Sequence, residues 1–152
     1  MGAVTYPAEG MGSFIDLNFI PVQVETTNKA LMEQYGVSWT PTILVLDAQG
    51  KEHYRIVGYV PPEEFMALFM VGKARWALDA GNYAEARAIL EEMMTRCPHP
   101  RAAAEAIYFL GVAKYKMDHD PKPLRAAYEE LKAKYPDSEW FRRAEPYVQI
   151  AL

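Results

Sequence analysis

The hydrophobic pattern of the first half of the chain predicts strands joined by short turns and a short helix. Apolar and polar residues alternate over Ile20–Glu25, which is typical of a half-buried strand. Thr42–Leu46 is a continuous run of β-branched and aliphatic residues, which favours an interior strand. Between these runs, Asn28 is a suitable N-cap for a short helix, and Gly36 lies where its C-terminal end is expected.

The same pattern continues into a hairpin and a longer helix. The turn residues Asp47–Gly50 predict a hairpin from the apolar run into a further strand, His53–Val57, which ends at Gly58. Pro61–Glu64 then predicts a helix start, because proline fits the first turn and carboxylates favour its dipole. The expected buried residues of this helix are Phe65, Leu68 and Phe69.

From about Val71 onward the apolar spacing is helical throughout and predicts an all-α part. One predicted helix follows a turn at Gly81–Asn82 and closes at Cys97–Pro98. Two more helices flank a turn at Asp118–Pro121, and the second closes at Tyr135–Pro136. The expected buried positions are Ala86, Ile89, Leu90 and Met93, then Ala106, Leu110, Gly111 and Tyr115, then Leu124, Ala127, Tyr128 and Leu131.

The distribution of charged residues divides the chain into two parts. The chain has 152 residues, 51% apolar and 24% charged, which is ordinary for a globular protein. Residues 1–70 carry 3 basic and 8 acidic residues, whereas residues 71–152 carry 13 and 12. We therefore predict two domains, 1–70 and 71–152, of α/β and all-α class respectively.

The same numbers exclude several partners. The net charge of −4 provides no basic field for phosphates, so nucleic acid is not an expected partner. No apolar run approaches the roughly 20 residues of a membrane helix, and the N-terminus lacks the features of a signal peptide. We expect a cytoplasmic protein that has no membrane partner.

Candidate chemistry is sparse. Cys97 is the single cysteine, so the sequence holds no internal disulfide, Cys-x-x-Cys pair or multi-cysteine zinc site. With His99 close by, Cys97 is a candidate reactive thiol, although a structural cysteine at a helix end is favoured. Asp118, His119 and Asp120 are interpreted as solvated turn residues because adjacent side chains diverge. We expect neither a metal nor a cofactor.

The most specific pattern is the ordered run from Tyr35 to Asp47, with Trp39-Thr40-Pro41-Thr42 at its centre and with Gly50 and Gly58 after it. This order of elements resembles the second half of the thioredoxin fold, over about residues 3–69. The resemblance implies a helix over residues 13–19 and a cis Thr40–Pro41 bond. It also implies that Trp39, Thr40 and Pro41 border a groove that accepts a peptide.

The resemblance further implies parts that this sequence does not contain. In thioredoxin-like proteins, a central strand and a Cys-x-x-Cys motif precede the segment that matches Ala3–Pro7, so the usual thiol–disulfide exchange has no residue to carry it here. Either the natural chain starts here or the sequence is the remainder of a longer protein. We favour the second explanation, because loss of the central strand would leave backbone groups of Ile20–Val24 and Thr42–Leu46 unpaired. For the same reason we expect a homodimer or larger species.

The helical part resembles a second family. The two closing prolines, Pro98 and Pro136, lie 38 residues apart, slightly more than the period of about 34 in tetratricopeptide repeats. Small and apolar residues fall where that repeat has them, at Ala86 and Leu90, and at Leu110, Gly111 and Ala127 in the second copy. The helical part thus resembles a degenerate pair of such repeats, and the alternative is another helical hairpin bundle.

Two functions are consistent with these interpretations. The first is a thioredoxin-like protein without redox cysteines that acts as an interaction module for a protein or peptide client and is not an enzyme. The alternative is a fragment of a thiol–disulfide oxidoreductase of redox homeostasis, whose Cys-x-x-Cys lies upstream. The presence of that motif in the extended reading frame would distinguish the two.

Overall fold

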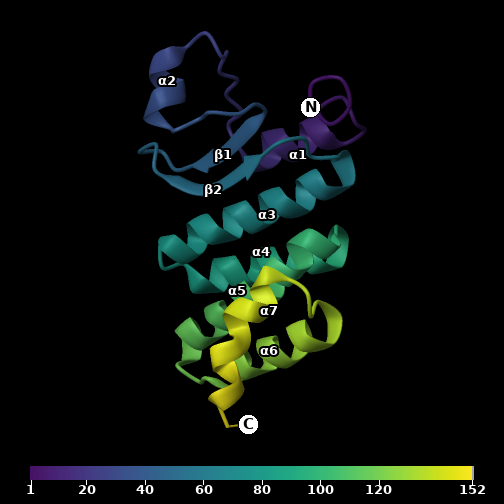
Figure 1. The fold of residues 1–152 in the computed structure, drawn as a ribbon, viewed down its shortest axis with the longest axis vertical. Helices are drawn as coiled ribbons and strands as arrows, with labels where there is room; N and C mark the ends of the chain where they lie inside the picture. The colour runs from purple at the N-terminus through teal and green to yellow at the C-terminus, as the bar shows by residue number, and fades with distance from the viewer. Residues whose placement is uncertain (152) are drawn as a thin grey trace.

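The computed structural model of the protein describes residues 1–151. A hairpin and two short helices lie at one end of the molecule, and stacked helices continue to the C-terminus at the other (Figure 1). The elements are α1 (Met11–Asn18), α2 (Lys29–Gln34), β1 (Thr42–Leu46), β2 (Glu52–Val57), α3 (Pro62–Asp79), α4 (Tyr83–Arg96), α5 (Pro100–Asp118), α6 (Lys122–Lys134), α7 (Glu139–Ala144) and the 3₁₀ helix η1 (Glu145–Gln149).

The sheet consists of β1 and β2, paired antiparallel. Val45 of β1 and Ile56 of β2 are both buried. The carboxylate of Asp47 shapes the turn, because it accepts hydrogen bonds from the backbone N–H groups of Gln49 and Lys51, each at 2.9 Å. The predicted turn and the strands on both sides of it are confirmed.

The predicted strand over Ile20–Glu25 is wrong. The segment has no regular secondary structure, and each of its residues is exposed. A strand needs a partner for its backbone groups, and within residues 1–151 the sheet holds only β1 and β2. The prediction that Thr42–Leu46 is an interior strand is also wrong, because β1 pairs on one side only.

Helix α3 joins the hairpin to the other helices. It begins after Pro61, with Pro62 in its first turn and with two glutamates there, as the sequence predicted. It packs against β1 and β2 and also against α4 and α5. The predicted domain boundary between residues 70 and 71 falls inside this helix, so the division into two domains stays a prediction.

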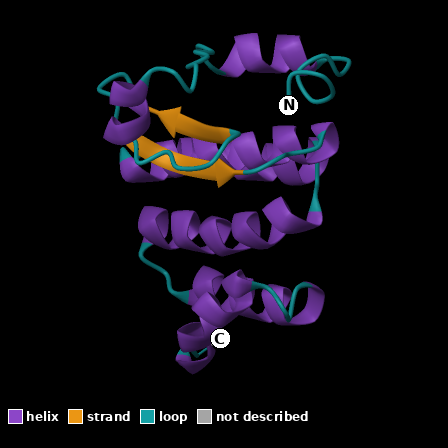
Figure 2. Ribbon diagram, turned by 45° about the horizontal axis from the view of Figure 1, so that its top comes forward, coloured by secondary structure: helices purple, strands orange, loops and turns teal. Residues whose placement is uncertain are grey.

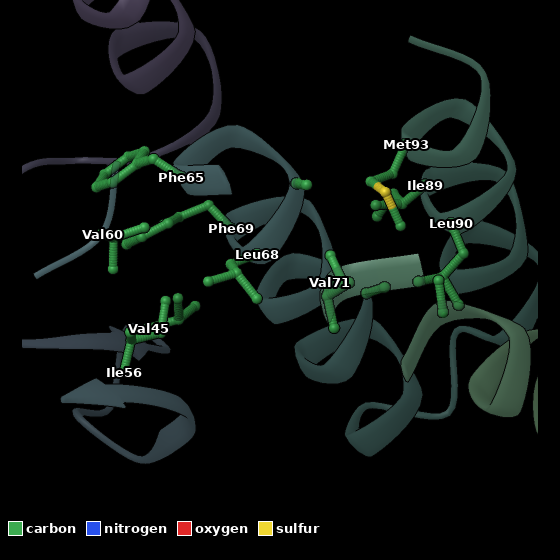
Figure 3. Packing of buried hydrophobic residues seen from close by; sticks show 14 of the residues in the cluster. Val45, Ile56, Val60, Phe65, Leu68, Phe69, Val71, Ile89, Leu90 and Met93 are labelled. Carbon is green, nitrogen blue, oxygen red and sulfur yellow. The ribbon is translucent and has the colours of Figure 1, made fainter. Parts of the chain in front are cut away.

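One hydrophobic core includes residues from both sides of α3 (Figure 3). The predicted residues Phe65, Leu68 and Phe69 are buried, and successive turns of α3 contribute to the core. Gly72 permits close contact with the hairpin, since a Cβ there would lie 3.0 Å from a methyl carbon of Val45. The labelled residues of this core are Val45, Ile56, Val60, Phe65, Leu68, Phe69, Val71, Ile89, Leu90 and Met93.

The remaining helices pack each against the next, α4 on α5 and α5 on α6. The apolar stripes predicted for α4 and α6 are buried, whereas in α5 Leu110 and Tyr115 are only half-buried. The axes of α5 and α6 approach closely at Gly111, where a Cβ would lie 2.8 Å from the Cβ of Ala127. Small residues at these two positions therefore permit the contact, as the sequence indicated.

The C-terminal end contains an element that the sequence analysis missed. The Ser138 hydroxyl accepts a hydrogen bond from the Phe141 N–H at 3.1 Å and caps α7. Trp140 and Ala144 of α7 are buried against α5 and α6. Within residues 1–151, no helix combines the length and the apolar character needed to cross a membrane.

Candidate peptide-binding edge

Residues 36–41, which we term the cis-proline loop, connect α2 to β1. The loop starts at Gly36, whose φ of 57° lies in the left-handed region that glycine favours. Just before it, Tyr35 ties α2 to the hairpin: its carbonyl accepts a hydrogen bond from Arg55 at 2.6 Å, and its hydroxyl donates to the Gly50 carbonyl at 3.3 Å. The start of the loop is therefore held against the hairpin.

The end of the loop is fixed by the strands. The Thr40–Pro41 bond is cis, and the Pro41 carbonyl accepts a hydrogen bond from the Gly58 N–H at 2.8 Å. The Thr42 hydroxyl donates to the Trp39 carbonyl at 2.7 Å. Trp39, Thr40 and Pro41 thus lie together beside β1, and the Trp39 side chain is 68% exposed.

The hydrogen bond between Gly58 and Pro41 also shows how the backbone groups of β1 point. Residues two apart in a strand direct their N–H and C=O groups to the same side. Ile43 and Val45 therefore face β2, whereas Thr42 and Leu44 direct theirs to the unpaired side, which we term the open edge of β1. Figure 2 shows the two strands without a third beside them in the described chain.

Most of the large apolar side chains that are exposed belong to the first 60 residues. Of the twelve large apolar residues that are exposed among residues 1–151, ten lie in the first 60 residues. The ten are Val4, Tyr6, Leu17, Ile20, Val22, Val24, Trp39, Leu46, Val57 and Tyr59.

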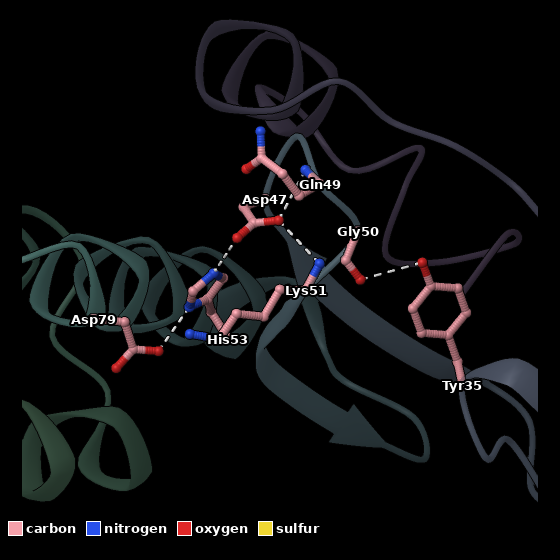
Figure 4. A network of polar contacts seen from close by, with 7 residues as sticks. All are labelled: Tyr35, Asp47, Gln49, Gly50, Lys51, His53 and Asp79. Carbon is pink, nitrogen blue, oxygen red and sulfur yellow. Dashed lines mark hydrogen bonds and ion pairs between the residues drawn. The ribbon is translucent and has the colours of Figure 1, made fainter.

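A buried histidine anchors the hairpin that carries this edge (Figure 4). His53 contacts Asp79 at the end of α3 through Nδ1 at 2.7 Å and Asp47 of the turn through Nε2 at 3.0 Å. Burial of the ring opposes protonation, but the hydrogen bonds to the two carboxylates outweigh it and raise the pKa of His53. The hydrogen bond from His53 and the backbone N–H groups of the turn lower the pKa of Asp47.

A second polar anchor joins β2 to the helical stack. Glu105 of α5 is buried and accepts hydrogen bonds from the Tyr54 hydroxyl at 2.9 Å and from Arg75 of α3 at 3.2 Å. Burial raises the pKa of Glu105, although both partners favour its ionised form. Burial and the carboxylate also raise the pKa of Tyr54. These contacts tie β2 to both α3 and α5.

Cys97, the candidate reactive thiol, lies at the C-terminal end of α4 and not on the cis-proline loop or the hairpin. Its sulfur donates to the Met70 sulfur at 3.5 Å, and burial raises the pKa of the thiol. His99 is not among the groups that shift the pKa of this thiol, and its own buried Nδ1 has no hydrogen-bond partner within residues 1–151. The geometry fits a structural cysteine.

Asp118, His119 and Asp120, interpreted above as solvated turn residues, lie where α5 ends. His119 has φ of 56° and ends α5 in the left-handed conformation. Asp120 accepts a hydrogen bond from the backbone N–H of Lys122 at 3.0 Å. Among residues 1–151, no group of three or more His, Cys, Asp and Glu side chains is placed to hold a metal ion.

The sequence analysis missed both polar anchors. His53 and Asp79 are 26 residues apart, and Tyr54 and Glu105 are 51 apart. Neither spacing is a recognisable motif. A weak signal exists for His53, because an imidazole near the start of a predicted strand and six residues after a turn aspartate is within reach of that carboxylate.

The front part of the chain matches the model of a known family. Residues 6–70 match the model of a family described as a thioredoxin-like domain. This match includes α1, α2, the cis-proline loop, the hairpin and the first half of α3, and it supports a thioredoxin fold for this part of the chain. The single cysteine, Cys97, lies outside the matched residues.

Searches of curated proteins and of solved structures found no match. The resemblance of the helical part to tetratricopeptide repeats therefore stays a prediction.

Proposed function

We propose that the thioredoxin-like domain binds an extended segment of a client protein along the open edge of β1, beside Trp39, Thr40 and Pro41. The observation that carries this proposal is the unpaired backbone of Thr42 and Leu44 next to a tryptophan that is 68% exposed. A polypeptide added to a sheet edge gains affinity from main-chain hydrogen bonds and specificity from contacts of alternate side chains. The backbone of Thr40 extends the same edge.

The surrounding surface favours a client segment of particular composition. Trp39 offers a large apolar face, and the exposed Leu46 lies at the other end of β1. Residues 1–70 carry 3 basic and 8 acidic residues, so basic residues in the client are attracted and acidic ones repelled. The preferred ligand is therefore an extended, alternating apolar segment with basic residues near its ends.

A designed peptide tests this proposal. The probe is a seven-residue peptide, Lys-Val-Thr-Val-Thr-Val-Lys, titrated into isotopically labelled protein while backbone amide signals are followed by NMR. We expect the largest shifts at Thr42 and Leu44. The same peptide with N-methyl groups on alternate residues, on the edge that faces β1, is expected to bind at least tenfold more weakly, because it cannot donate the hydrogen bonds.

The side-chain contribution is tested with matched variants. Trp39→Ala is expected to weaken binding of the peptide about tenfold, since it removes the apolar face. Met117→Ala, which truncates an exposed apolar residue on α5, is the control and leaves binding unchanged. Equal affinity of the wild-type protein and Trp39→Ala, or of the methylated and plain peptides, would refute binding at this edge.

We also propose that this chain does not by itself catalyse dithiol–disulfide exchange. The usual reaction needs two cysteines, and the sequence has Cys97 alone, with a thiol pKa raised by burial. In an insulin-reduction assay with dithiothreitol, we expect the purified chain to give the rate of a protein-free control. A higher rate that Cys97→Ser abolishes would contradict this.

For the helical part, we propose that α4, α5 and α6 are tetratricopeptide-like hairpins. The sequential packing of these helices and the small residues at Gly111 and Ala127 support this. An experimental structure in which α6 packs on α4 rather than on α5 would contradict the proposal.

A further inference from the structure

The segment Ile20–Glu25 has the composition of a strand but lacks a partner. Its ends are fixed in the molecule, because the Phe19 ring packs edge-on against Phe69 at 5.5 Å and Asn28 caps α2. Between them, Ile20 is 92% exposed and Val22 79% exposed, and Val24 is exposed on the same side of the alternation. Burial of three apolar side chains on one face is the usual reason for such a pattern.

Proline decides which edge of this segment is able to pair. Pro21 has no N–H, so the edge that includes residue 21 is interrupted. The opposite edge carries the N–H and C=O groups of Ile20, Val22 and Val24. The residues with the apolar side chains are therefore also those with the backbone groups free for pairing.

From these observations we infer that two copies of this chain form a symmetric dimer in which residues 20–25 of each copy add to the open edge of β1 in the other. The lengths agree, since the segment has six residues and β1 has five. Each chain supplies one unpaired segment and one unpaired strand edge. In a dimer with a two-fold axis, the segment of each copy pairs with the edge of the other, so both segments and both edges are paired. Neither Ile20–Val24 nor Thr42–Leu46 contains a charged residue, so the paired strands bring no like charges together.

The area available predicts a weak dimer. Burial of Ile20, Val22, Val24 and Trp39 in each copy removes about 100 Å² per side chain, or about 800 Å² in total, to which backbone contacts add. Without the backbone contacts, this is about a third below the lower limit of the usual range of about 1,200–2,000 Å² for stable interfaces. A dissociation constant on the order of 10 μM is therefore expected.

The test is sedimentation equilibrium of the full chain between about 1 and 300 μM in about 150 mM salt. The wild-type protein is expected to change from 17.3 kDa at the lowest concentrations towards twice that mass at the highest. Val22→Pro removes an N–H on the pairing edge and is expected to raise the dissociation constant at least tenfold. Gln23→Pro, the matched control, removes an N–H on the opposite edge and leaves the dimer intact.

Both substitutions are compatible with the folded monomer, because within residues 1–151 neither Val22 nor Gln23 donates a backbone hydrogen bond. Equal circular dichroism of the two variants confirms this. A wild-type protein that remains monomeric at 300 μM overturns the inference, and so does equal dimerisation of both proline variants. The dimer and the client would occupy the same open edge of β1, so excess peptide is expected to dissociate the dimer. A chain that dimerises, but in which excess peptide neither binds nor dissociates the dimer, supports the dimer and refutes client binding.

Discussion

Gly111→Ala tests how much the stability of the protein depends on the close approach of α5 and α6. The new Cβ would lie 2.8 Å from the Cβ of Ala127 and 3.0 Å from the backbone carbonyl oxygen of Pro123. Carbon atoms in contact are normally about 3.5–4.0 Å apart, so the two helices must separate by about 1 Å. Neither neighbour is the mobile end of a long side chain, so the strain cannot be relieved by a rotamer change.

Two effects of opposite sign determine the result. Overpacking a rigid site costs about 2–3 kcal/mol, at the upper end of the usual range. Replacement of glycine by alanine within a helix contributes about 1 kcal/mol of stability. The net loss is therefore about 1–2 kcal/mol, which lowers Tm by about 3–8 °C in a chain of this size.

Urea and thermal unfolding, followed by circular dichroism, measure this change. Gly12→Ala in α1 is the matched control, because no atom lies within 4 Å of its Cβ position, and it is expected to raise stability by up to about 1 kcal/mol. In the double variant Gly111→Ala/Ala127→Gly, the loss should be smaller than the sum of the single losses, by about 1 kcal/mol. A Gly111→Ala protein as stable as the wild type would refute the reasoning.

Three further predictions concern the polar anchors and the thiol. Because the pKa of His53 is raised, protonated His53 stabilises the fold fully at pH values below the ordinary histidine pKa of 6.5, and this stability is lost as pH rises through the pKa of the folded protein. Because the pKa of Asp47 is lowered, ionised Asp47 stabilises the fold at pH values above the ordinary aspartate pKa of 3.8, and this stability is lost as pH falls through the pKa of the folded protein. Thermal unfolding should therefore show a maximum between these values, and His53→Gln should flatten the alkaline limb; a Tm that rises from about pH 6 to 8 would contradict this. Glu105→Ala leaves the Tyr54 hydroxyl and Arg75 without their buried acceptor and should cost about 1–3 kcal/mol in urea unfolding, whereas Glu91→Ala, at an exposed ion pair, should cost under about 1 kcal/mol. Because burial raises its pKa, Cys97 should react with iodoacetamide more slowly than glutathione at about pH 8 and at a comparable rate in urea, and equal rates in the native protein would be evidence against burial.

Elements defined by local interactions were predictable from the sequence. The Asn28 side chain accepts a hydrogen bond from the Leu31 N–H at 3.2 Å, as expected of an N-cap. The turn at Asp47, the hairpin and the start of α3 are likewise set by residues close in sequence. The predicted helix over residues 13–19 is α1, with its start two residues earlier and its end one residue earlier.

Features that depend on distant partners were not predictable. Ile20–Glu25 has the alternation of a strand, but alternation specifies only which side chains share a face and supplies no strand to pair with. The His53–Asp79 contact requires knowledge of how α3 lies on the hairpin. For the candidate site, the residues Trp39, Thr40 and Pro41 came from a resemblance, whereas the open edge beside them is visible only in the sheet topology.

Helix α3 limits how this protein can be divided or recombined. Its 18 residues supply both the helix that covers the hairpin and the first helix of the stack. A cut between residues 70 and 71 would leave each piece with half a helix and an uncovered apolar face. If the hairpin were transplanted into another protein, α3 would have to go with it. The face of α3 that packs against α4 here would then be uncovered. A substitution on one face of α3 affects the packing on its other face. We therefore expect residues of the hairpin and of the helical stack to co-vary in evolution.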